Sequence, residues 1–318
     1  MKDIQKPLLI VCGPTASGKT RLAIDLALRF GGEVVSADSM QVYKGMDIGT
    51  AKPTKQEMRG VLHHLIDMLR PDEDFSVAQY AQLARKIIAD IHARGKLPIL
   101  AGGTGLYIKA IADNIQYGKI PEDENLRERL RLQAQQLGNT RMLERLREID
   151  PHLGETLHPN NLGRIIRAIE VYELTGEPMS LWQKRSREIP GEYSLCMLGL
   201  MYFDRALLYE RIEKRIDEML LRGLLDEAKA LFEAGFSGTA SQAIGYKELF
   251  GFLRGEQTLQ EAVSGLKRET CRYAKRQLTW FRRDERIRWL YADNPGGYDR
   301  VFAEACEIAA EEQITNNR

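Results

Sequence analysis

A glycine-rich run near the N-terminus has the residue types and spacing of a phosphate-binding loop. Residues 13–20 read GPTASGKT and fit the pattern GxxxxGK[ST] at every required position. They follow an apolar run and precede a helix-like segment, which is the context that this motif requires. Backbone N–H groups and the helix N-terminus would bind phosphate oxygens, Lys19 would neutralise them and Thr20 would ligate Mg²⁺. The predicted diphosphate-binding residues here are Gly13, Pro14, Thr15, Ala16, Ser17, Gly18, Lys19 and Thr20.

The motif indicates a diphosphate but not the molecule that carries it. A glycine-rich turn between a strand and a helix, with a surface lysine, would show the same letters without a ligand. A kinase that transfers the γ-phosphoryl group of ATP to a small acceptor would use the same loop. An RNA-binding ATPase would use it too, but the sequence shows no convincing apolar strand with an acidic end of the kind that places an aspartate for a hydrolytic Mg²⁺, which weighs against it.

Asp38 follows the second apolar run, where a strand is expected to end. In an open parallel sheet such a residue would emerge beside the phosphate-binding loop, at the carboxyl edge of the strands. A carboxylate there can be a general base or help to hold a metal, whereas an N-cap or turn aspartate is the alternative role. The run over residues 38–53 is polar, glycine-rich and long, which favours a binding loop over a simple connection.

Alternating apolar runs and helical segments predict a parallel α/β sheet. The expected strands cover residues 7–12, 33–37, 64–68, 97–101, 195–200 and 287–291. The expected helices cover residues 19–30, 76–94, 205–232 and 259–282. Apolar residues recur at helical spacing between residues 118 and 192 without any strand pattern. We therefore predict an α/β fold, a P-loop NTPase-like parallel sheet core flanked by helices (1–117 and 193–318), with an all-helical insertion domain (118–192).

Composition limits the kinds of binding, cysteine chemistry and membrane association that this chain can have. The net charge is only +1, so nucleic-acid binding would have to depend on local basic patches. The four cysteines stand far apart with no CxxC pair, which is typical of reduced thiols and favours small buried side chains over nucleophiles. No apolar run is long enough to span a membrane, and the N-terminus lacks a signal-type apolar stretch. We expect a cytoplasmic monomer with no membrane contact.

Several motifs in one order resemble the tRNA dimethylallyltransferases, also called tRNA isopentenyltransferases or the IPP transferase family. The glycine-rich loop is followed by DSMQVYKGMDIGTAKP at 38–53, HHLIDM at 63–68 and GGTGLY at 102–107. Further matches are RIIRAIE at 164–170, RIEKR at 211–215, AIGY at 243–246 and RYAKRQLTWFR at 272–282. The resemblance covers roughly residues 8–290.

The resemblance implies transfer of a dimethylallyl group from dimethylallyl diphosphate to N6 of the adenosine immediately 3′ of the tRNA anticodon, with Mg²⁺. Cleavage of the allylic C–O bond puts negative charge on pyrophosphate, which cations and N–H donors would stabilise. Lys19 and Arg215 match this role, and Arg215 joins the diphosphate-binding set. Asp38 matches the family's catalytic aspartate and would take the N6 proton. Thr104 matches a catalytic residue near the reacting centre, although its hydroxyl could instead only cap the following helix.

The resemblance also implies contacts with the anticodon stem-loop from both domains. The matching positions are Asp38, Ser39, Met40, Gln41, Thr104, Arg127, Gly163, Arg164, Ile165, Ile166, Arg167, Arg272, Lys275 and Arg276. Gly163 departs from the family pattern, where a glutamine or a basic residue is common. Residues 267–288 hold nine Lys or Arg against three Asp or Glu, with Tyr273, Trp280 and Phe281 interleaved. Such a tract suits single-stranded RNA, but Trp280 and Phe281 could equally belong to the core.

Overall fold

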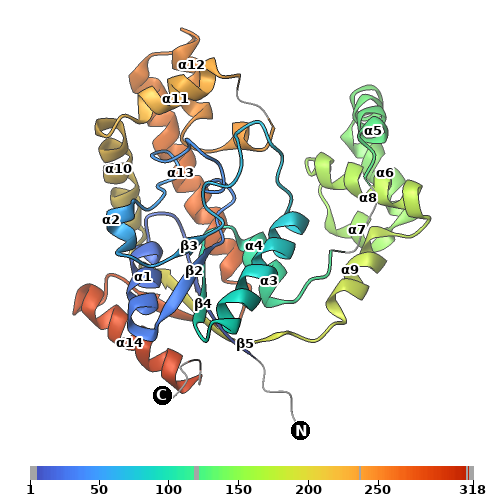
Figure 1. Cartoon of the computed structure of the whole chain (residues 1–318). Coiled ribbons are helices and arrows are strands. Elements are labelled where there is room, and N and C mark those ends of the chain that lie inside the picture. The colour runs from blue at the N-terminus through green and yellow to red at the C-terminus, as the bar shows by residue number, and fades with distance from the viewer. Residues whose placement is uncertain (1–5, 118–121, 236–237, 313, 315–318) are drawn as a thin grey trace. The chain divides into compact units, whose positions relative to one another are not determined.

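The computed structural model describes residues 6–117, 122–235, 238–312 and 314 of the chain (Figure 1). The chain divides into two compact units, one of residues 1–112 with 192–318 and one of residues 113–191. The predicted start of the insertion at residue 118 lies outside the described residues. Among the described residues, no helix combines the length and the apolar character needed to cross a membrane.

The larger unit is built on one parallel sheet. Its strands are β1 (Lys6–Cys12), β2 (Gly32–Ser36), β3 (His63–His64), β4 (Leu97–Gly102), β5 (Tyr193–Met201) and β6 (Ile287–Tyr291). They lie in the order β3-β2-β4-β1-β5-β6, and each of these strands runs parallel to its neighbours. Both faces of a parallel sheet are covered, which explains why the strands read as nearly continuous apolar runs. The predicted α/β class and parallel sheet are confirmed.

Helices cover both faces of this sheet (Figure 1). The helices of this unit are α1 (Lys19–Phe30), α2 (Lys55–Met58), α3 (Val77–Ala93), α4 (Gly105–Ala112), α10 (Arg205–Leu221), α11 (Leu224–Glu233), α12 (Lys247–Leu253), α13 (Leu259–Phe281) and α14 (Gly297–Glu311), with a 3₁₀ turn at Ala240–Gln242. Leu9 and Val11 point into the core beneath α1 and α14. The alternate residues Leu8 and Ile10 are equally buried and face the other side, which α3 and α4 cover.

Two expected elements differ from the structure for identifiable backbone reasons. The strand expected at residues 64–68 stops after His64, because Leu65 and Asp67 adopt left-handed backbone angles (φ 62° and 53°) that interrupt an extended strand. The helical segment expected at 205–232 is divided into α10 and α11. Gly223 separates them with φ 98°, a conformation that glycine adopts without a steric penalty.

The smaller unit consists of helices. They are α5 (Glu124–Leu137), α6 (Asn139–Ile149), α7 (Pro151–Thr156), α8 (Leu162–Thr175) and α9 (Met179–Arg187). Leu126, Leu130, Leu146 and Ile169 are buried in a separate apolar core between α5, α6 and α8. The helical spacing seen in the sequence therefore marks the inner faces of these three helices.

Candidate functional site

The phosphate-binding loop is shaped by a few unusual backbone angles between β1 and α1. Gly13 has φ 145°, and a Cβ atom there would lie 2.3 Å from the carbonyl oxygen of Leu200, so no side chain fits. Ala16 and Gly18 have positive φ angles of 62° and 97°. Gly18 is the N-cap of α1 and provides no side-chain cap, so the helix starts at Lys19 without a side-chain acceptor at its N-terminus. This geometry suits an anion.

The side chains of the loop divide into those that cover it and those beneath it. Nζ of Lys19 reaches back over the loop and donates to the carbonyl oxygen of Pro14 at 3.1 Å. Ser17 is buried, and its hydroxyl has no hydrogen-bond partner among the described residues. Ser17 could therefore contact a diphosphate only through its backbone. Thr20 lies in the first turn of α1 and is half-buried.

Two arginines of α10 bracket this loop. Arg211 donates from Nε to the carbonyl oxygen of Ala16 at 3.2 Å, and Nη1 of Arg215 lies 3.5 Å from Oγ1 of Thr15. Residues four apart share a helix face, so both side chains reach the same loop. Burial lowers the pKa of Arg215, while the charge of Asp38 acts in the opposite direction. Arg215 is thus brought to the diphosphate-binding loop.

The pKa of Lys19 is shifted by burial and by its charged neighbours. Burial lowers its pKa to about 8, the carboxylate of Asp38 opposes that shift and the positive charge of Arg215 adds to it. A lysine with this pKa is still mostly protonated at pH 7. Lys19, Arg215 and Asp38 therefore belong to one electrostatic cluster over the loop.

The end of β4 lies between the strands that carry the phosphate loop and Asp38. β4 pairs with β1 on one side and with β2 on the other. A Cβ at Gly102 would lie 2.1 Å from the carbonyl oxygen of Ala37, so this position requires glycine for a close backbone approach. Oγ1 of Thr104 accepts from the backbone N–H of Ser39 at 3.0 Å, and its own N–H donates to Ala37 at 3.0 Å. Thr104 thus fixes the start of the loop that carries Asp38.

Asp38 is held by the turn that follows it. Its Oδ1 accepts from the backbone N–H groups of Met40 at 2.9 Å and Gln41 at 3.3 Å. The turn role considered from the sequence is therefore present. Among the described residues, no hydrogen bond to Oδ2 is formed, so that oxygen is the one suited to accept a proton. The side chain of Gln41 points back into its loop and donates to the carbonyls of Thr50 and Ala51.

Gln277 of α13 connects the phosphate loop with the end of β4. Its Oε1 accepts from the N–H of Thr15 at 2.9 Å, and its Nε2 donates to the carbonyl oxygen of Gly103 at 2.9 Å. Tyr273 lies one turn earlier. Burial and the charge of Asp38 raise the pKa of Tyr273, whereas hydrogen bonding with Gln277 and Thr104 opposes the shift. One face of α13 therefore contacts the phosphate loop and the segment that follows β4.

The loop over residues 38–53 is anchored by a carboxylate and a lysine. Both oxygens of Glu227 accept hydrogen bonds from successive backbone N–H groups of the loop, at 2.9–3.0 Å from Asp47, Ile48 and Gly49. Oε1 of Glu227 also accepts from the hydroxyl of Tyr246 at 2.7 Å. The buried side chain of Lys52 forms ion pairs with Asp47 and Asp67 on the other side of the loop. The polar run is thus an ordered loop.

The basic residues predicted on α13 face solvent beside this site. Arg272, Lys275 and Arg276 are exposed, and the Arg276 guanidinium lies 5.7 Å from the ring centre of Tyr273. The two aromatic residues that follow have different environments. Phe281 is a core residue, whereas Trp280 is 37% exposed and covers Gly105, where a Cβ would lie 2.2 Å from its ring. Trp280 is thus partly available to a ligand.

The predicted RNA contacts of the helical unit lie around α8. Gly163 and Arg164 are exposed, and a Cβ at Gly163 would meet open space. Ile165 and Ile166 are buried in the apolar core of this unit, so their side chains are not available to RNA. Arg127 and Arg167 are half-buried and converge on Glu170.

Three functional residues of the core site were not predicted from the sequence: Arg211, Gln277 and Glu227. Arg211 could have been found from its position four residues before Arg215 on the same helix face. Gln277 stands one turn after Tyr273 within a recognised motif. Glu227 offered no local pattern, because its partners lie about 180 residues earlier in the chain.

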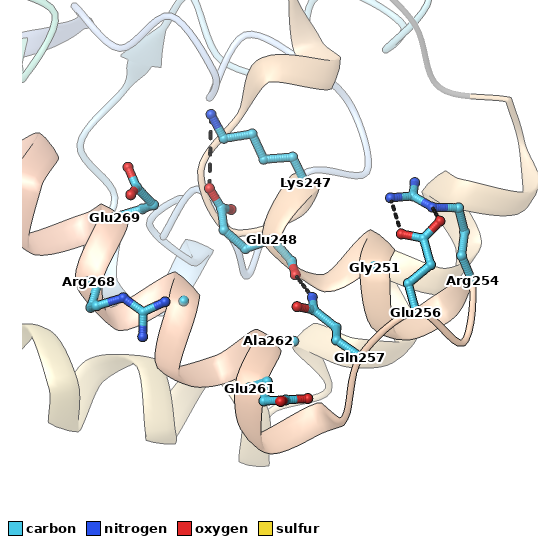
Figure 2. A pocket seen from close by; sticks show the side chains of 11 residues that line it. Lys247, Glu248, Gly251, Arg254, Glu256, Gln257, Glu261, Ala262, Arg268 and Glu269 are labelled. Carbon is cyan, nitrogen blue, oxygen red and sulfur yellow. Dashed lines mark hydrogen bonds and ion pairs between the residues drawn. The ribbon is translucent and has the colours of Figure 1, made fainter.

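A hollow between α12 and α13 contains none of the predicted site residues (Figure 2). It has a volume of about 470 Å³. Its charged side chains are engaged locally: Arg254 pairs with Glu256 at 2.7 Å, and Glu261 completes the N-terminal capping box of α13. Gln257 donates to the backbone carbonyl of Glu248 at 3.0 Å. We place no step of the chemistry in this hollow.

Comparison with known proteins decides the family. The sequence model of the IPP transferase family matches residues 41–284. The chain belongs to this family. It is 50% identical over 307 residues to the tRNA dimethylallyltransferase of Caldanaerobacter subterraneus, covering 95% of this chain and 97% of that protein. It is 52% identical over 285 residues to tRNA dimethylallyltransferase 1 of Pelobacter propionicus, covering 89% and 92%.

Solved structures of IPP transferases show the same architecture. The tRNA isopentenylpyrophosphate transferase of Bacillus halodurans is 44% identical, with a TM-score of 0.72 and 97% of each chain covered. A eukaryotic dimethylallyltransferase acting on tRNA is 29% identical, with a TM-score of 0.82, covering 99% of this chain and 80% of that one. The family membership predicted from the motifs is confirmed, and the small-molecule kinase and RNA-binding ATPase alternatives are set aside.

Proposed function

We propose that this chain transfers a dimethylallyl group from dimethylallyl diphosphate to N6 of the adenosine immediately 3′ of the anticodon in tRNA, and that it releases pyrophosphate. The similarity to tRNA dimethylallyltransferases over nearly the whole chain supports the reaction class. The observation that carries the proposal is the meeting of Lys19, Arg215 and Asp38 in one electrostatic cluster at the phosphate loop. The site can thereby bind a diphosphate and place a general base beside it.

The diphosphate would lie in the cradle formed by residues 13–20. Backbone N–H groups at the N-terminus of α1 face the anion, and Lys19 and Arg215 supply positive charge. These groups stabilise the negative charge that develops on pyrophosphate as the allylic C–O bond breaks. Because Arg211 and Gln277 hold the backbone of the loop at Ala16 and Thr15, little reorganisation of the loop is needed during the reaction.

Asp38 would remove the proton from N6 of adenine while the new N–C bond forms. The amine is a weak nucleophile because its lone pair is delocalised into the ring, and general-base assistance is typically worth about 10²–10⁴-fold. Oδ1 is occupied by two backbone N–H groups, so Oδ2 is the oxygen assigned to the proton. Thr104 positions this residue by holding the N–H of Ser39.

Mg²⁺ fits the donor set of the loop. Thr20 offers one hard oxygen, and this ion commonly takes its other ligands from phosphates and water. In the described part of the chain, no three His, Cys, Asp or Glu side chains lie together so that they could hold a metal ion. Bound there, Mg²⁺ would neutralise charge on the diphosphate.

The proposed RNA contacts use Ser39, Met40 and Gln41 beside the catalytic aspartate, the exposed face of α13 and residues of α8. We further propose that the enzyme acts as a monomer. A tRNA substrate also implies a cytoplasmic enzyme.

A base stacked in the anticodon loop must be extruded before its amine can reach Asp38.

The test is to supply unmodified tRNA with either ATP or dimethylallyl diphosphate and to measure which of the two compounds is consumed. We expect pyrophosphate release and prenylated tRNA only with dimethylallyl diphosphate, and no turnover when tRNA is omitted. Consumption of ATP without prenylation would contradict the proposal.

A further inference from the structure

Two arginines of the helical unit share one buried carboxylate. Glu170 of α8 is fully buried, and its Oε2 accepts hydrogen bonds from Nε of Arg127 at 2.9 Å and from Nη1 of Arg167 at 2.7 Å. Its Oε1 accepts from the backbone N–H of Asp123 at 2.8 Å. Burial raises the pKa of Glu170, but the hydrogen bonds from Arg167, Asp123 and Arg127 outweigh it and hold the pKa below its usual range. The carboxylate therefore fixes both guanidinium groups.

A second carboxylate contacts the same two groups. Oε1 of Glu122 lies 3.3 Å from Nη2 of Arg127 and 3.4 Å from Nη2 of Arg167. These contacts are longer than those of Glu170, and the side chain of Glu122 is 61% exposed. Exposed ion pairs contribute at most about 1 kcal/mol, so another anion can replace Glu122 at small cost.

The charges around the pair favour a monoanion at the place of Glu122. The two guanidinium groups exceed the one carboxylate of Glu170 by one positive charge. Glu124 also lies 3.4 Å from Nη1 of Arg127, but it makes a shorter contact of 2.7 Å with Arg131. An RNA phosphodiester carries one negative charge, and arginine binds phosphate oxygens with directional N–H donors.

The resemblance already assigns Arg127 and Arg167 to the RNA; we propose that Glu170 positions their guanidinium groups for one phosphodiester, and that Glu122 occupies the phosphate's place in the free chain. The proposal rests on the proposed function, because the phosphate is taken to belong to the tRNA substrate. It assigns Glu170 as a positioning residue and Glu122 as a built-in competitor.

The first test compares Glu122→Gln with Glu144→Gln in the full-length chain, by measuring the Kd for unmodified tRNA without the prenyl diphosphate. Glu144 is a matched control, since it is an exposed carboxylate of the same unit paired with a different arginine, Arg141. We expect Glu122→Gln to bind tRNA about two- to fivefold more tightly, whereas Glu144→Gln should change little. Equal effects of the two substitutions would overturn the competitor role.

The second test separates positioning from net charge. Glu170→Gln removes a negative charge, so a general electrostatic effect would tighten tRNA binding, whereas loss of positioning should raise the KM for tRNA with little change in kcat. Tighter binding by this variant would refute the positioning role. Because Glu170→Gln could fail to fold, the effect of Glu122→Gln is also measured in an Arg167→Gln background. There the gain should shrink, because only the contact of Glu122 with Arg127 remains, and its full persistence would overturn the proposal.

A further measurement distinguishes failure of the phosphate site from failure of the proposed function. Arg167→Gln should reduce the slope of log affinity against log salt concentration by about one, as expected for one lost phosphate contact. If the wild-type chain prenylates tRNA while these variants behave like the control, only the phosphate site is wrong. If the wild-type chain does not prenylate tRNA at all, the proposed function fails first.

Discussion

The side chain of Gln277 accepts a hydrogen bond from the backbone N–H of Thr15 at 2.9 Å, although 262 residues separate the two in the chain. Through its other amide atom the same side chain holds Gly103, next to the residue that fixes the Asp38 loop. The phosphate loop and the proposed base are therefore linked by a single buried amide. This link makes the relative position of the two groups testable.

Replacing Gln277 with Leu should remove both hydrogen bonds and leave the N–H of Thr15 and the carbonyl of Gly103 without this partner. The free energy of unfolding should fall by about 1–3 kcal/mol, the usual cost of leaving such buried groups unsatisfied. Because small displacements of reacting groups are costly, kcat/KM should fall by about tenfold to a hundredfold. Gln260→Leu, on the exposed surface of the same helix, is the control. Steady-state kinetics identical to wild type would show that the link is dispensable.

Replacing Asp38 with Asn should preserve the fold and diphosphate binding but reduce turnover at least a hundredfold. The amide oxygen of Asn can still accept from Met40 and Gln41, so the turn remains. The amide cannot take a proton from the attacking amine, which removes general-base assistance. The rate is measured in single turnover with saturating substrates, with Asp72→Asn as a control on an exposed side chain. Turnover like that of the wild type would remove Asp38 from the mechanism.

The charge of Lys19 predicts a pH dependence. Its pKa is lowered to about 8, so the side chain is protonated and attracts the diphosphate at pH 7, and this attraction is lost as the pH rises through about 8. We expect kcat/KM for dimethylallyl diphosphate, which reports the free enzyme, to decline with an inflection near that pH. Lys19→Met should be impaired at pH 7 and lack the inflection, whereas Lys229→Met on α11 should keep it. An unchanged inflection in Lys19→Met would assign the titration to another group.

The anchoring of the 38–53 loop by Glu227 can be tested with Glu227→Gln. The substitution replaces one acceptor oxygen with an NH₂ group that opposes the backbone N–H donors of Ile48 and Gly49. The free energy of unfolding should fall by about 1–3 kcal/mol, and cleavage of the loop by a protease should become faster. Asp226→Asn, the exposed neighbour, is the matched control. Equal protease resistance of the two variants would show that the loop is held by other contacts, such as those of Lys52.

The sequence predicted the local elements of this fold well and the long-range contacts poorly. The helix at Lys19–Phe30 and the strand at Ile287–Tyr291 have the expected bounds, because their apolar patterns are local and because Gly18 and Gly31 flank the helix. The position of β4 between β1 and β2 is a property of sheet order that no local pattern encodes. The roles of Gln277 and Glu227 depend on contacts across 174–262 residues, so they could only be recognised in three dimensions. The resemblance assigned the whole segment 163–167 to RNA binding. Because Ile165 and Ile166 are buried, their side chains cannot contact RNA.

The most direct test of the proposed reaction is to locate the modified nucleotide. Unmodified tRNA is incubated with the wild-type chain, Mg²⁺ and dimethylallyl diphosphate, digested with a nuclease and analysed by mass spectrometry. We predict a single dimethylallyl group on N6 of the adenosine immediately 3′ of the anticodon, and its near absence with Asp38→Asn. A dimethylallyl group on another nucleotide, or equal modification by the Asp38→Asn variant, would contradict it.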